Sequence, residues 1–265
     1  MIFLKVNRGL INQMNFLDKH RKKFLLSKEA IEKTFLDLLL KKGALKVIQS
    51  VREPFILKSG RASPYFINIG ALTDGESLVK IKWAFTSFIV HLLEQGMLEK
   101  FNFIFGPAYK GITLAALSCE GLSEIYGINT RYIYDRKEVK SYGDISADKI
   151  IVGANHFNRE DKILLIDDVV TTGETKIDSL EKLKVLGSHT VVGLVLLVDR
   201  QEKMSDKNQI VKKSAVTFIQ EELGIKVFSI LTSKKIFDLM KENLSEAVIN
   251  YWIDYNNKYV GETPV

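Results

Sequence analysis

The fold class is decided by the stretch Ile163-Leu-Leu-Ile-Asp-Asp-Val-Val-Thr-Thr-Gly-Glu-Thr175. Its apolar start predicts a β-strand, and the unbroken apolar run is typical of strands buried on both faces of a parallel sheet. The threonines and Gly173 then lead into a helical stretch, so the segment is a strand–turn–helix unit. The first turn of such a helix presents free backbone N–H groups and the positive end of the helix dipole, which suits a phosphate group.

A unit of the same kind precedes this one, and each unit continues into a further strand. The first unit has a strand at 101–105, a turn at 106–111, a helix at 112–126 and a strand at 130–134. The second has a strand at 162–166, a loop at 169–175, a helix at 176–186 and a strand at 191–198. This alternation predicts an α/β fold with a mostly parallel sheet, in which ligands bind beyond the carboxyl ends of the strands.

The residues before about position 70 predict a small lobe attached to this sheet. Ser27 can cap a helix that Gly43 ends, and residues 47–69 read as short strands broken by prolines and a glycine. We expect residues 1–26 to be an N-terminal extension, because Asp18 and the scarcity of Ser and Ala argue against a targeting peptide. We expect one domain at 27–265, with a hood at about 27–70, a core at about 71–235 and a C-terminal helical segment at about 236–265.

Two polar segments interrupt the predicted strands and helices. Residues 135–159 are charged and show little periodicity, and a loop of this length in a compact domain is usually a functional lid or disordered. Residues 201–213 form a second polar insertion.

The composition limits the classes of protein to which the chain can belong. Of 265 residues, 46% are hydrophobic, so the chain can bury a real core, and no apolar stretch reaches the ~18 residues of a membrane span. The single Cys119 excludes an internal disulfide and a multi-cysteine zinc site, and it favours the cytoplasm. The net charge of +6 is scattered apart from a basic run at 19–23, and no aromatic–basic stripe is evident. We therefore expect neither a nucleic-acid partner nor a membrane partner.

The residues that close the predicted strand at 162–166 carry a specific chemistry. Asp167 and Asp168 can accept hydrogen bonds from vicinal ribose hydroxyls, either directly or through a metal ion. Thr171, Thr172 and Thr175 can donate hydroxyl groups to a phosphate at the start of the helix. An ordinary capped turn also uses Asp and Thr, but the whole run in a single strand–helix turn favours a ribose-phosphate site.

The run Asp167–Thr175 resembles the ribose-phosphate signature of type I phosphoribosyltransferases. Four further segments resemble the orotate phosphoribosyltransferase family in the same order, namely Leu57-Lys-Ser-Gly-Arg-Ala-Ser-Pro-Tyr-Phe66, Phe105-Gly-Pro-Ala-Tyr-Lys-Gly-Ile112, Asp135-Arg-Lys-Glu-Val-Lys140 and Asp199-Arg-Gln-Glu202. The resemblance covers roughly residues 27–235. It implies the type I phosphoribosyltransferase fold, a mostly parallel, Rossmann-like sheet flanked by helices with a small N-terminal hood lobe.

The resemblance implies a reaction and a set of donor-binding residues. The family transfers the phosphoribosyl group of 5-phosphoribosyl 1-diphosphate (PRPP) to orotate, with Mg²⁺, and forms orotidine 5′-monophosphate and pyrophosphate in pyrimidine biosynthesis. The implied PRPP-binding residues are Lys58, Tyr109, Lys110, Arg136, Lys137, Lys140, Tyr142, Asp167, Asp168, Val169, Val170, Thr171, Thr172, Gly173, Glu174 and Thr175. Those with an implied catalytic role are Lys140, Arg136, Lys137, Asp167 and Asp168. Mg²⁺ is held mainly through PRPP, with Asp167 or Asp168 contributing through water.

The resemblance also implies partners and a base site. It assigns Lys58, Phe66, Ile67, Thr171 and Arg200 to orotate, with Arg200 pairing the anionic edge of the base. It implies a homodimer in which a mobile loop at 136–148 closes over pyrophosphate and is shared across the two active sites. The downstream decarboxylase is a further candidate partner.

Three positions depart from the family pattern. Tyr142 stands where a histidine is common, which puts proton donation to pyrophosphate in doubt because tyrosine stays neutral near pH 7. Ile67 stands where an aromatic residue is common, so one wall of the base site is thinner. Glu174 replaces a small hydroxyl residue, and we expect its carboxylate to point away from the phosphate that it would repel.

Three alternatives remain open at this point. A phosphoribosyltransferase for a purine or for uracil would keep residues 167–175 without needing Arg200. A regulatory nucleic-acid-binding protein on the same fold could lose the cations at Arg136, Lys137 and Lys140, which this chain retains. A dinucleotide-binding oxidoreductase is disfavoured because no G-x-G-x-x-G follows a strand.

Overall fold

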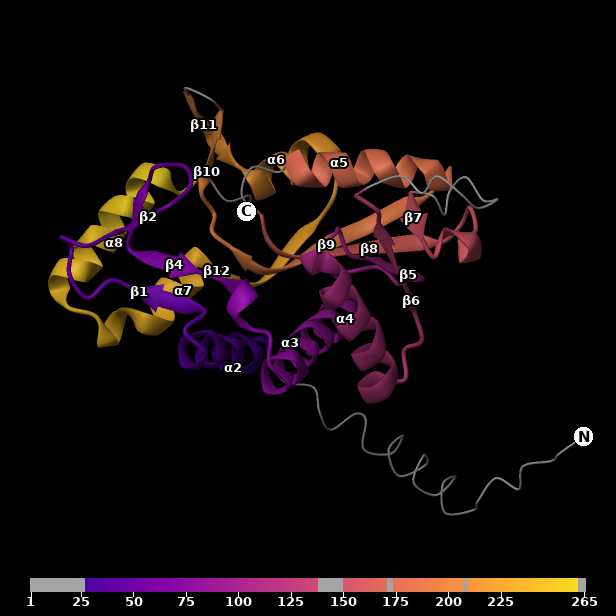
Figure 1. The fold of residues 1–265 in the computed structure, drawn as a ribbon, viewed down its shortest axis with the longest axis horizontal. Coiled ribbons are helices and arrows are strands. Elements are labelled where there is room, and N and C mark those ends of the chain that lie inside the picture. The colour runs from indigo at the N-terminus through magenta and orange to yellow at the C-terminus, as the bar shows by residue number, and fades with distance from the viewer. Residues whose placement is uncertain (1–26, 138–149, 171–173, 207–208, 262–265) are drawn as a thin grey trace, which may run out of the picture.

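The computed structural model describes residues 27–137, 150–170, 174–206 and 209–261 and is built around one six-stranded sheet (Figure 1). Its strand order is β12–β9–β8–β5–β6–β7. The strands span Phe103–Phe105 (β5), Arg131–Asp135 (β6), Ile151–Val152 (β7), Lys162–Val170 (β8), Thr190–Asp199 (β9) and Val227–Thr232 (β12). All pairings are parallel except that of β7, which runs antiparallel to β6 at the edge. The predicted fold class, an α/β fold with a mostly parallel sheet flanked by helices, is confirmed.

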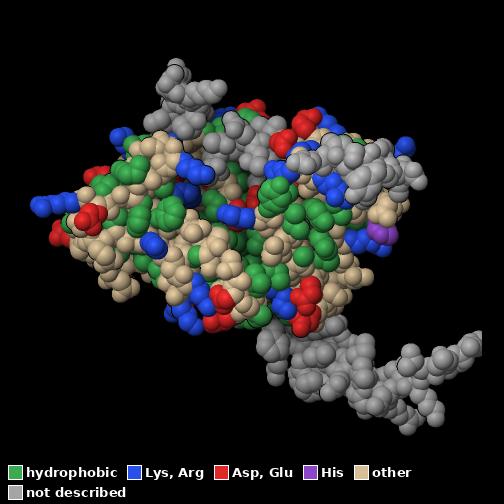
Figure 2. Space-filling view, in the orientation of Figure 1, with side chains coloured by type: hydrophobic (Ala, Val, Ile, Leu, Met, Phe, Trp, Pro, Cys, Tyr) green, Lys and Arg blue, Asp and Glu red, His purple; other side chains and the backbone are tan. Residues whose placement is uncertain are grey.

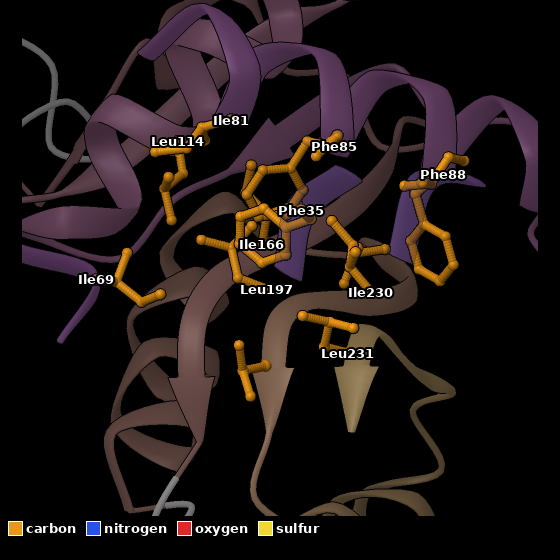
Figure 3. Packing of buried hydrophobic residues seen from close by; sticks show 14 of the residues in the cluster. Phe35, Ile69, Ile81, Phe85, Phe88, Leu114, Ile166, Leu197, Ile230 and Leu231 are labelled. Carbon is orange, nitrogen blue, oxygen red and sulfur yellow. The ribbon is translucent and has the colours of Figure 1, made fainter. Parts of the chain in front are cut away.

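The sheet is buried on both faces because side chains alternate along each strand. In β8, Leu164 and Ile166 point into one core cluster, whereas Ile163 and Leu165 point into a second cluster on the opposite face. The first cluster is covered by α2 (Lys28–Lys41), α3 (Gly75–Glu94) and α4 (Lys110–Tyr126), and Figure 3 shows part of it. The second cluster is covered by α5 (Glu174–Leu183) and α6 (Ala215–Leu223).

The helices begin and end at residues that suit those positions. Ser27 caps α2 by accepting a hydrogen bond from the backbone N–H of Ala30, and Asp74 caps α3 in the same way through Ser77. Gly127 ends α4 in the left-handed conformation, at φ 66°. Short 3₁₀ turns, η2 (Ile69–Ala71), η4 (Ala154–His156), η5 (Lys184–Leu186) and η6 (Lys241–Asn243), connect other elements. Among the described residues, no helix has the length and apolar character that crossing a membrane requires.

The N-terminal strands pack with the C-terminal helices in one lobe, and from here on we call this lobe the hood. Its strands are β1 (Leu45–Val47) paired with β4 (Tyr65–Ile67), and β2 (Phe55–Ile56) paired with β3 (Ala62–Ser63). Beside them lie α7 (Ser233–Met240) and α8 (Glu246–Tyr259), as Figure 1 shows. Trp252 of α8 stacks on Tyr65 of β4 at 4.9 Å between ring centroids. This contact joins the two ends of the described chain in one lobe.

The structure differs from the sequence-based expectation in three elements. Strand β8 runs to Val170 rather than to residue 166, because it stays paired with β9 until Val170 lies opposite Asp199. The segment predicted as one loop at 135–159 contains β7 and η4. The polar insertion at 201–213 forms a hairpin of β10 (Lys203–Asp206) and β11 (Gln209–Ser214).

Candidate active site

The candidate site lies where the order of the strands reverses. The chain passes from β5 to β6 on one side, and then from β8 through β9 to β12 on the other side, while β5 and β8 are neighbours. The connections that follow β5 and β8 leave the same edge of the sheet and lead in opposite directions, to β6 and to β9, so the two turns diverge. Ligands of open parallel sheets bind at such a reversal, beyond the carboxyl ends of the strands.

The turn between β5 and α4 is tight and requires two glycines. A Cβ atom at Gly106 would collide with the backbone carbonyl of Gly111, and a Cβ atom at Gly111 would lie 2.6 Å from Cδ of Pro107. The peptide bond between Ala108 and Tyr109 is cis. The turn presents Tyr109, which is 73% exposed, and Lys110 at the start of α4.

Asp167 and Asp168 form the end of β8, and Lys110 reaches across from the neighbouring turn. The Nζ atom of Lys110 donates to Oδ2 of Asp168 at 2.7 Å, which brings two predicted donor-binding residues into contact. Successive side chains leave a strand on opposite sides, which separates the two carboxylates. Each accepts a hydrogen bond from the next backbone N–H, Asp167 from that of Asp168 at 2.8 Å and Asp168 from that of Val169 at 2.9 Å. Their fixed oxygens can accept hydrogen bonds from a ribose.

Asp135 joins the turn after β5 to the helix after β8. It is 2% exposed, its Oδ1 accepts from the backbone N–H of Ala108 at 2.6 Å, and its Oδ2 accepts from Nζ of Lys182 in α5 at 2.7 Å. This hydrogen bond raises the pKa of Lys182. Asp135 stood in a segment that carried the family resemblance, yet no property of the sequence signals that its carboxylate is buried between two loops.

The predicted cationic loop begins directly after Asp135. The backbone N–H of Arg136 donates to the carbonyl of Ile150 at 2.8 Å, so β6 and β7 hold the two ends of this segment together. The Nζ atom of Lys137 lies 6.0 Å from the ring centroid of Tyr109, at the outer limit of a cation–π contact. The described residues thus place Arg136 and Lys137 beside the turn that carries Lys110.

Several predicted site residues lie outside the described residues. These are Lys140, Tyr142, Thr171, Thr172 and Gly173, together with most of the loop at 136–148 and the extension at 1–26. The backbone of Glu174 and Thr175 forms the start of α5, but their side chains, including the expected outward direction of Glu174, also lie outside this part.

The hood contributes Lys58 and Phe66 on its surface. Lys58 is exposed in the turn between β2 and β3. Phe66 is 39% exposed, and its ring lies 5.9 Å from that of Phe55. Ile67 packs against the first core cluster instead, since neighbouring residues of β4 point to opposite sides.

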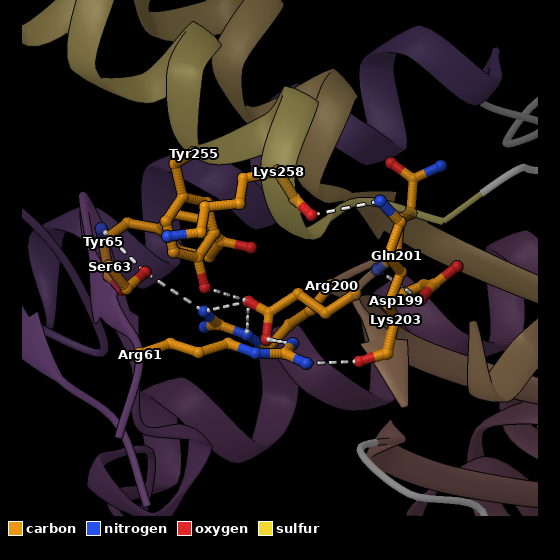
Figure 4. A network of polar contacts seen from close by, with 10 residues as sticks. Arg61, Ser63, Tyr65, Asp199, Arg200, Gln201, Lys203, Tyr255 and Lys258 are labelled. Carbon is orange, nitrogen blue, oxygen red and sulfur yellow. Dashed lines mark hydrogen bonds and ion pairs between the residues drawn. The ribbon is translucent and has the colours of Figure 1, made fainter. Parts of the chain in front are cut away.

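Arg200 follows β9 directly, at the same sheet edge as Asp167 and Asp168, and is 8% exposed. Its Nε and Nη2 atoms donate to Oε1 of Glu202 at 2.8 and 2.6 Å, and Nη2 also donates to Oγ of Ser63 at 3.2 Å (Figure 4). Its guanidinium lies 4.3 Å from the ring centroid of Tyr65. Burial raises the pKa of Tyr65 to about 12, so this ring stays neutral.

The motif at 199–202 also contains a residue to which sequence reasoning gave no role. Glu202 accepts hydrogen bonds from Arg200, from Nη1 of Arg61 at 3.1 Å and from the hydroxyl of Tyr255 at 2.8 Å. Burial raises the pKa of Tyr255, which keeps that hydroxyl protonated and able to donate. Tyr255 belongs to α8, in the C-terminal segment for which the sequence predicts no site residue.

The face of the molecule in Figure 2 shows Lys and Arg side chains around a hollow between the hood and the sheet. Such a surface suits an anionic ligand. Within the described residues, no group of three or more His, Cys, Asp and Glu side chains could hold a metal ion by itself. A metal ion at the pair Asp167 and Asp168 would therefore need ligands from a bound substrate or from water.

Comparison with known proteins places this arrangement in a family. No protein-family model matches the chain. The orotate phosphoribosyltransferase of Bifidobacterium adolescentis is 39% identical over 210 residues, which are 79% of this chain and 85% of that protein. A crystal structure of orotate phosphoribosyltransferase from Francisella tularensis superposes with a TM-score of 0.72 at 34% identity and covers 86% of this chain and 99% of that one.

A more distant structure shares the fold. Orotate phosphoribosyltransferase of Mycobacterium tuberculosis in complex with PRPP superposes with a TM-score of 0.50 at 17% identity and covers 77% of this chain and 98% of that one. The identity over most of the chain, together with the sheet and the two turns at its reversal point, leads to one conclusion. The chain belongs to the orotate phosphoribosyltransferase family.

Proposed function

We propose that the protein transfers the 5-phosphoribosyl group of PRPP to orotate, giving orotidine 5′-monophosphate and pyrophosphate in pyrimidine biosynthesis. The observation that carries this proposal is the contact between Lys110 and Asp168 at the reversal of strand order, with Arg200 at the same sheet edge. A cation and two carboxylates there suit a ribose bearing a diphosphate. A buried arginine close to the hood suits an anionic base.

The donor end of the site would hold PRPP through backbone and side-chain groups. The start of α5 offers N–H groups for the 5-phosphate, and Asp167 and Asp168 would accept from the ribose hydroxyls. Lys110 would exchange its partner Asp168 for the diphosphate, because its side chain is 58% exposed and can turn. Lys58 and Tyr109 would approach the same ligand from the hood and from the turn.

Mg²⁺ fits this site as a substrate-borne ion. Carboxylate oxygens are ligands that Mg²⁺ accepts, and it commonly binds through one or two carboxylates plus substrate phosphates. Asp167 or Asp168 would hold such an ion through water while PRPP supplies the other oxygens. When bound, Mg²⁺ neutralises charge on the departing pyrophosphate.

The chemical step is a substitution at the anomeric carbon of the ribose. Its transition state carries positive charge on the sugar, so the protein would act by orienting the base and by stabilising pyrophosphate with cations. Arg136, Lys137 and Lys140 would supply these cations from a mobile loop that closes over the site and excludes water. The base would rest against Phe66 and Thr171, with its carboxylate on Arg200.

The substrate assignment is tested with a panel of bases. The protein is mixed with PRPP, Mg²⁺ and orotate, uracil or adenine in turn, and pyrophosphate release is followed. We expect release with orotate alone, because only orotate has a carboxylate for Arg200. Release with uracil or adenine but not with orotate would contradict the proposal, and omission of Mg²⁺ tests the metal requirement in the same assay.

The role of the cationic loop is tested with Lys140→Ala. We expect turnover to fall about 100-fold or more with a smaller change in orotate binding, since the charge acts on the leaving pyrophosphate in the transition state. Steady-state kinetics and orotate titration measure the two quantities. Unchanged turnover would remove Lys140 from the mechanism.

We propose that the protein is a cytoplasmic homodimer whose loop at 136–148 serves the partner's active site. Mixing inactive Lys140→Ala and Asp168→Ala chains after joint refolding tests this arrangement. A shared loop regenerates one intact site in each mixed dimer, so up to about a quarter of wild-type activity returns. No recovery in mixed dimers of confirmed composition would show that each chain uses its own loop. A decarboxylase acting on orotidine 5′-monophosphate would be the next enzyme and a candidate partner.

A further inference from the structure

The protein binds the guanidinium of Arg200 through its Nε and Nη2 atoms, and this determines which of its N–H donors can bind a ligand. Its Nε and Nη2 atoms donate to Oε1 of Glu202, and Nη2 also donates to Ser63. Within the part of the chain that the structure describes, Nη1 makes no hydrogen bond. Because a guanidinium carries five N–H donors in a rigid plane, fixing the Nε side also fixes the direction of the Nη1 donors.

Glu202 is in turn fixed by groups from distant parts of the chain. Arg61 of the hood donates to its Oε2 at 3.1 Å, and Tyr255 of α8 donates to its Oε1 at 2.8 Å. Arg61 also donates to the carbonyl of Lys203 at 2.7 Å, and Glu202 itself forms an antiparallel bridge with Val260. The side chain of Glu202 is 13% exposed, so these contacts are shielded from water. The carboxylate therefore has one position, set from three sides.

We propose that Glu202 is a positioning residue for base recognition. It orients Arg200 so that the Nη1 donors face the carboxylate of the base, and through Tyr255 it makes helix α8 part of the orotate site. This inference rests on the proposed function, since it concerns how Arg200 selects orotate. Glu202 need not contact the base, and its effect should be confined to ligands that carry the carboxylate.

The test compares two nucleotides that differ only in that carboxylate. Orotidine 5′-monophosphate and uridine 5′-monophosphate are titrated calorimetrically into the full-length protein and its variants, and the ratio of their dissociation constants is taken. In Glu202→Ala we expect the preference for orotidine 5′-monophosphate to fall about tenfold, the change that ~1.4 kcal/mol of lost positioning produces. Uridine 5′-monophosphate should bind as to the wild-type protein.

Two tyrosines of α8 provide a matched control for the role of the helix. Tyr255→Phe removes the hydroxyl that donates to Glu202, whereas Tyr251→Phe removes one that donates to the carbonyl of Ala62 at 3.0 Å. We expect the preference to fall about threefold in Tyr255→Phe and to stay at the wild-type value in Tyr251→Phe. Glu202→Gln keeps an oxygen acceptor and should recover part of the loss seen in Glu202→Ala.

The outcomes separate this inference from the proposed function. If the wild-type protein forms no orotidine 5′-monophosphate, the proposed function itself fails. If the wild-type protein does form orotidine 5′-monophosphate, two results would overturn the inference. Either Glu202→Ala keeps the wild-type preference, or it weakens the binding of both nucleotides equally, and in both cases Glu202 is merely structural. Should Glu202→Ala fail to fold, Glu202→Gln and Tyr255→Phe decide the question, because each keeps most of the buried contacts.

Discussion

Asp199, at the end of β9, lies in surroundings that disfavour its charge. The residue is 6% exposed, and burial raises the pKa of its carboxyl from 3.8 to about 6, although the backbone N–H of Gln201 donates to it at 2.7 Å. Because the folded pKa lies above the unfolded pKa, the folded state binds more protons between about pH 4 and 6. The contribution of Asp199 to stability is therefore present below about pH 4 and is lost as the pH rises through 6.

Above about pH 6 the buried, charged carboxylate of Asp199 destabilises the folded state, and Asp199→Asn should remove this cost. At ~1.4 kcal/mol per pH unit, the raised pKa corresponds to roughly 3 kcal/mol at pH 8, as an upper bound. The amide oxygen of Asn can still accept from Gln201, so we expect the variant to be more stable than wild type at pH 8 and equal to it near pH 4. Urea unfolding at both pH values measures the difference, and a variant that is less stable at pH 8 would contradict the expectation.

At the scale of the residue, sequence reasoning found the groups that belong to recognisable segments. Lys110, Asp168 and Arg200 were predicted as site residues, and the structure brings the first two into contact. Sequence reasoning gave no role to Glu202 or Asp135, although both lie in segments that resemble the family. Their importance arises from burial among partners far away in the chain, and neither burial nor a distant partner leaves a local pattern.

At the scale of the element, Asp135 connects the end of β6, the turn after β5 and helix α5. Part of this connection is an ion pair between Asp135, whose side chain is 2% exposed, and Lys182, whose side chain is 23% exposed. Lys182 also pairs with Asp178, but that side chain is 58% exposed. Two carboxylates thus share one lysine in different surroundings, and the buried one, Asp135, connects the turn after β5 to helix α5.

Asp135→Asn should loosen this connection, whereas Asp178→Asn should not. We expect Asp135→Asn to cost about 2 kcal/mol in the free energy of unfolding and to raise the KM for PRPP about tenfold, because the lysine loses its shielded partner. Asp178→Asn should change the unfolding free energy by less than ~0.5 kcal/mol, as exposed pairs usually do. Urea unfolding and steady-state kinetics compare the variants, and equal effects would refute a special role for Asp135.

The elements themselves were largely predictable, and the misjudged end of β8 has a physical reason. Two carboxylates after an apolar run suggested that the strand stops at residue 166, yet Asp167 lies opposite Leu196 and Val170 lies opposite Asp199. Pairing with the long neighbouring strand β9 outweighs the low strand preference of aspartate. The hairpin at 203–214 is predictable only as a polar insertion, because its residues lack an apolar alternation.

At the scale of the whole molecule, Trp252 holds the C-terminal helices on the hood. Its side chain is fully buried, stacks on Tyr65 at 4.9 Å and lies 5.4 Å from Phe237 of α7. Sequence periodicity can show that a helix has an apolar face, but it does not show which element covers that face. The placement of α8 beside strands almost 190 residues earlier therefore emerged only from the structure.

Trp252→Ala should destabilise the protein by roughly 3–5 kcal/mol, the usual cost of removing a large buried aromatic side chain. Trp252→Phe keeps an aromatic ring on Tyr65 and should cost less than half as much. Thermal and urea unfolding measure both variants. A loss below ~1 kcal/mol in Trp252→Ala would show that α8 is not held by this contact.

Because the hood combines both ends of the described chain, it would also set the order in which the proposed site is completed during synthesis on the ribosome. In the proposed site, the donor half would use Lys58 of the hood and residues between about 105 and 182, all of which precede β9 in the chain. The proposed base half would need Ser63, Arg200 and Tyr255, so it would be complete only after the last helix has left the exit tunnel. If the proposed function holds, a nascent chain would contain all residues of the sugar-phosphate pocket before it contains Tyr255, so base discrimination would be the last property to appear.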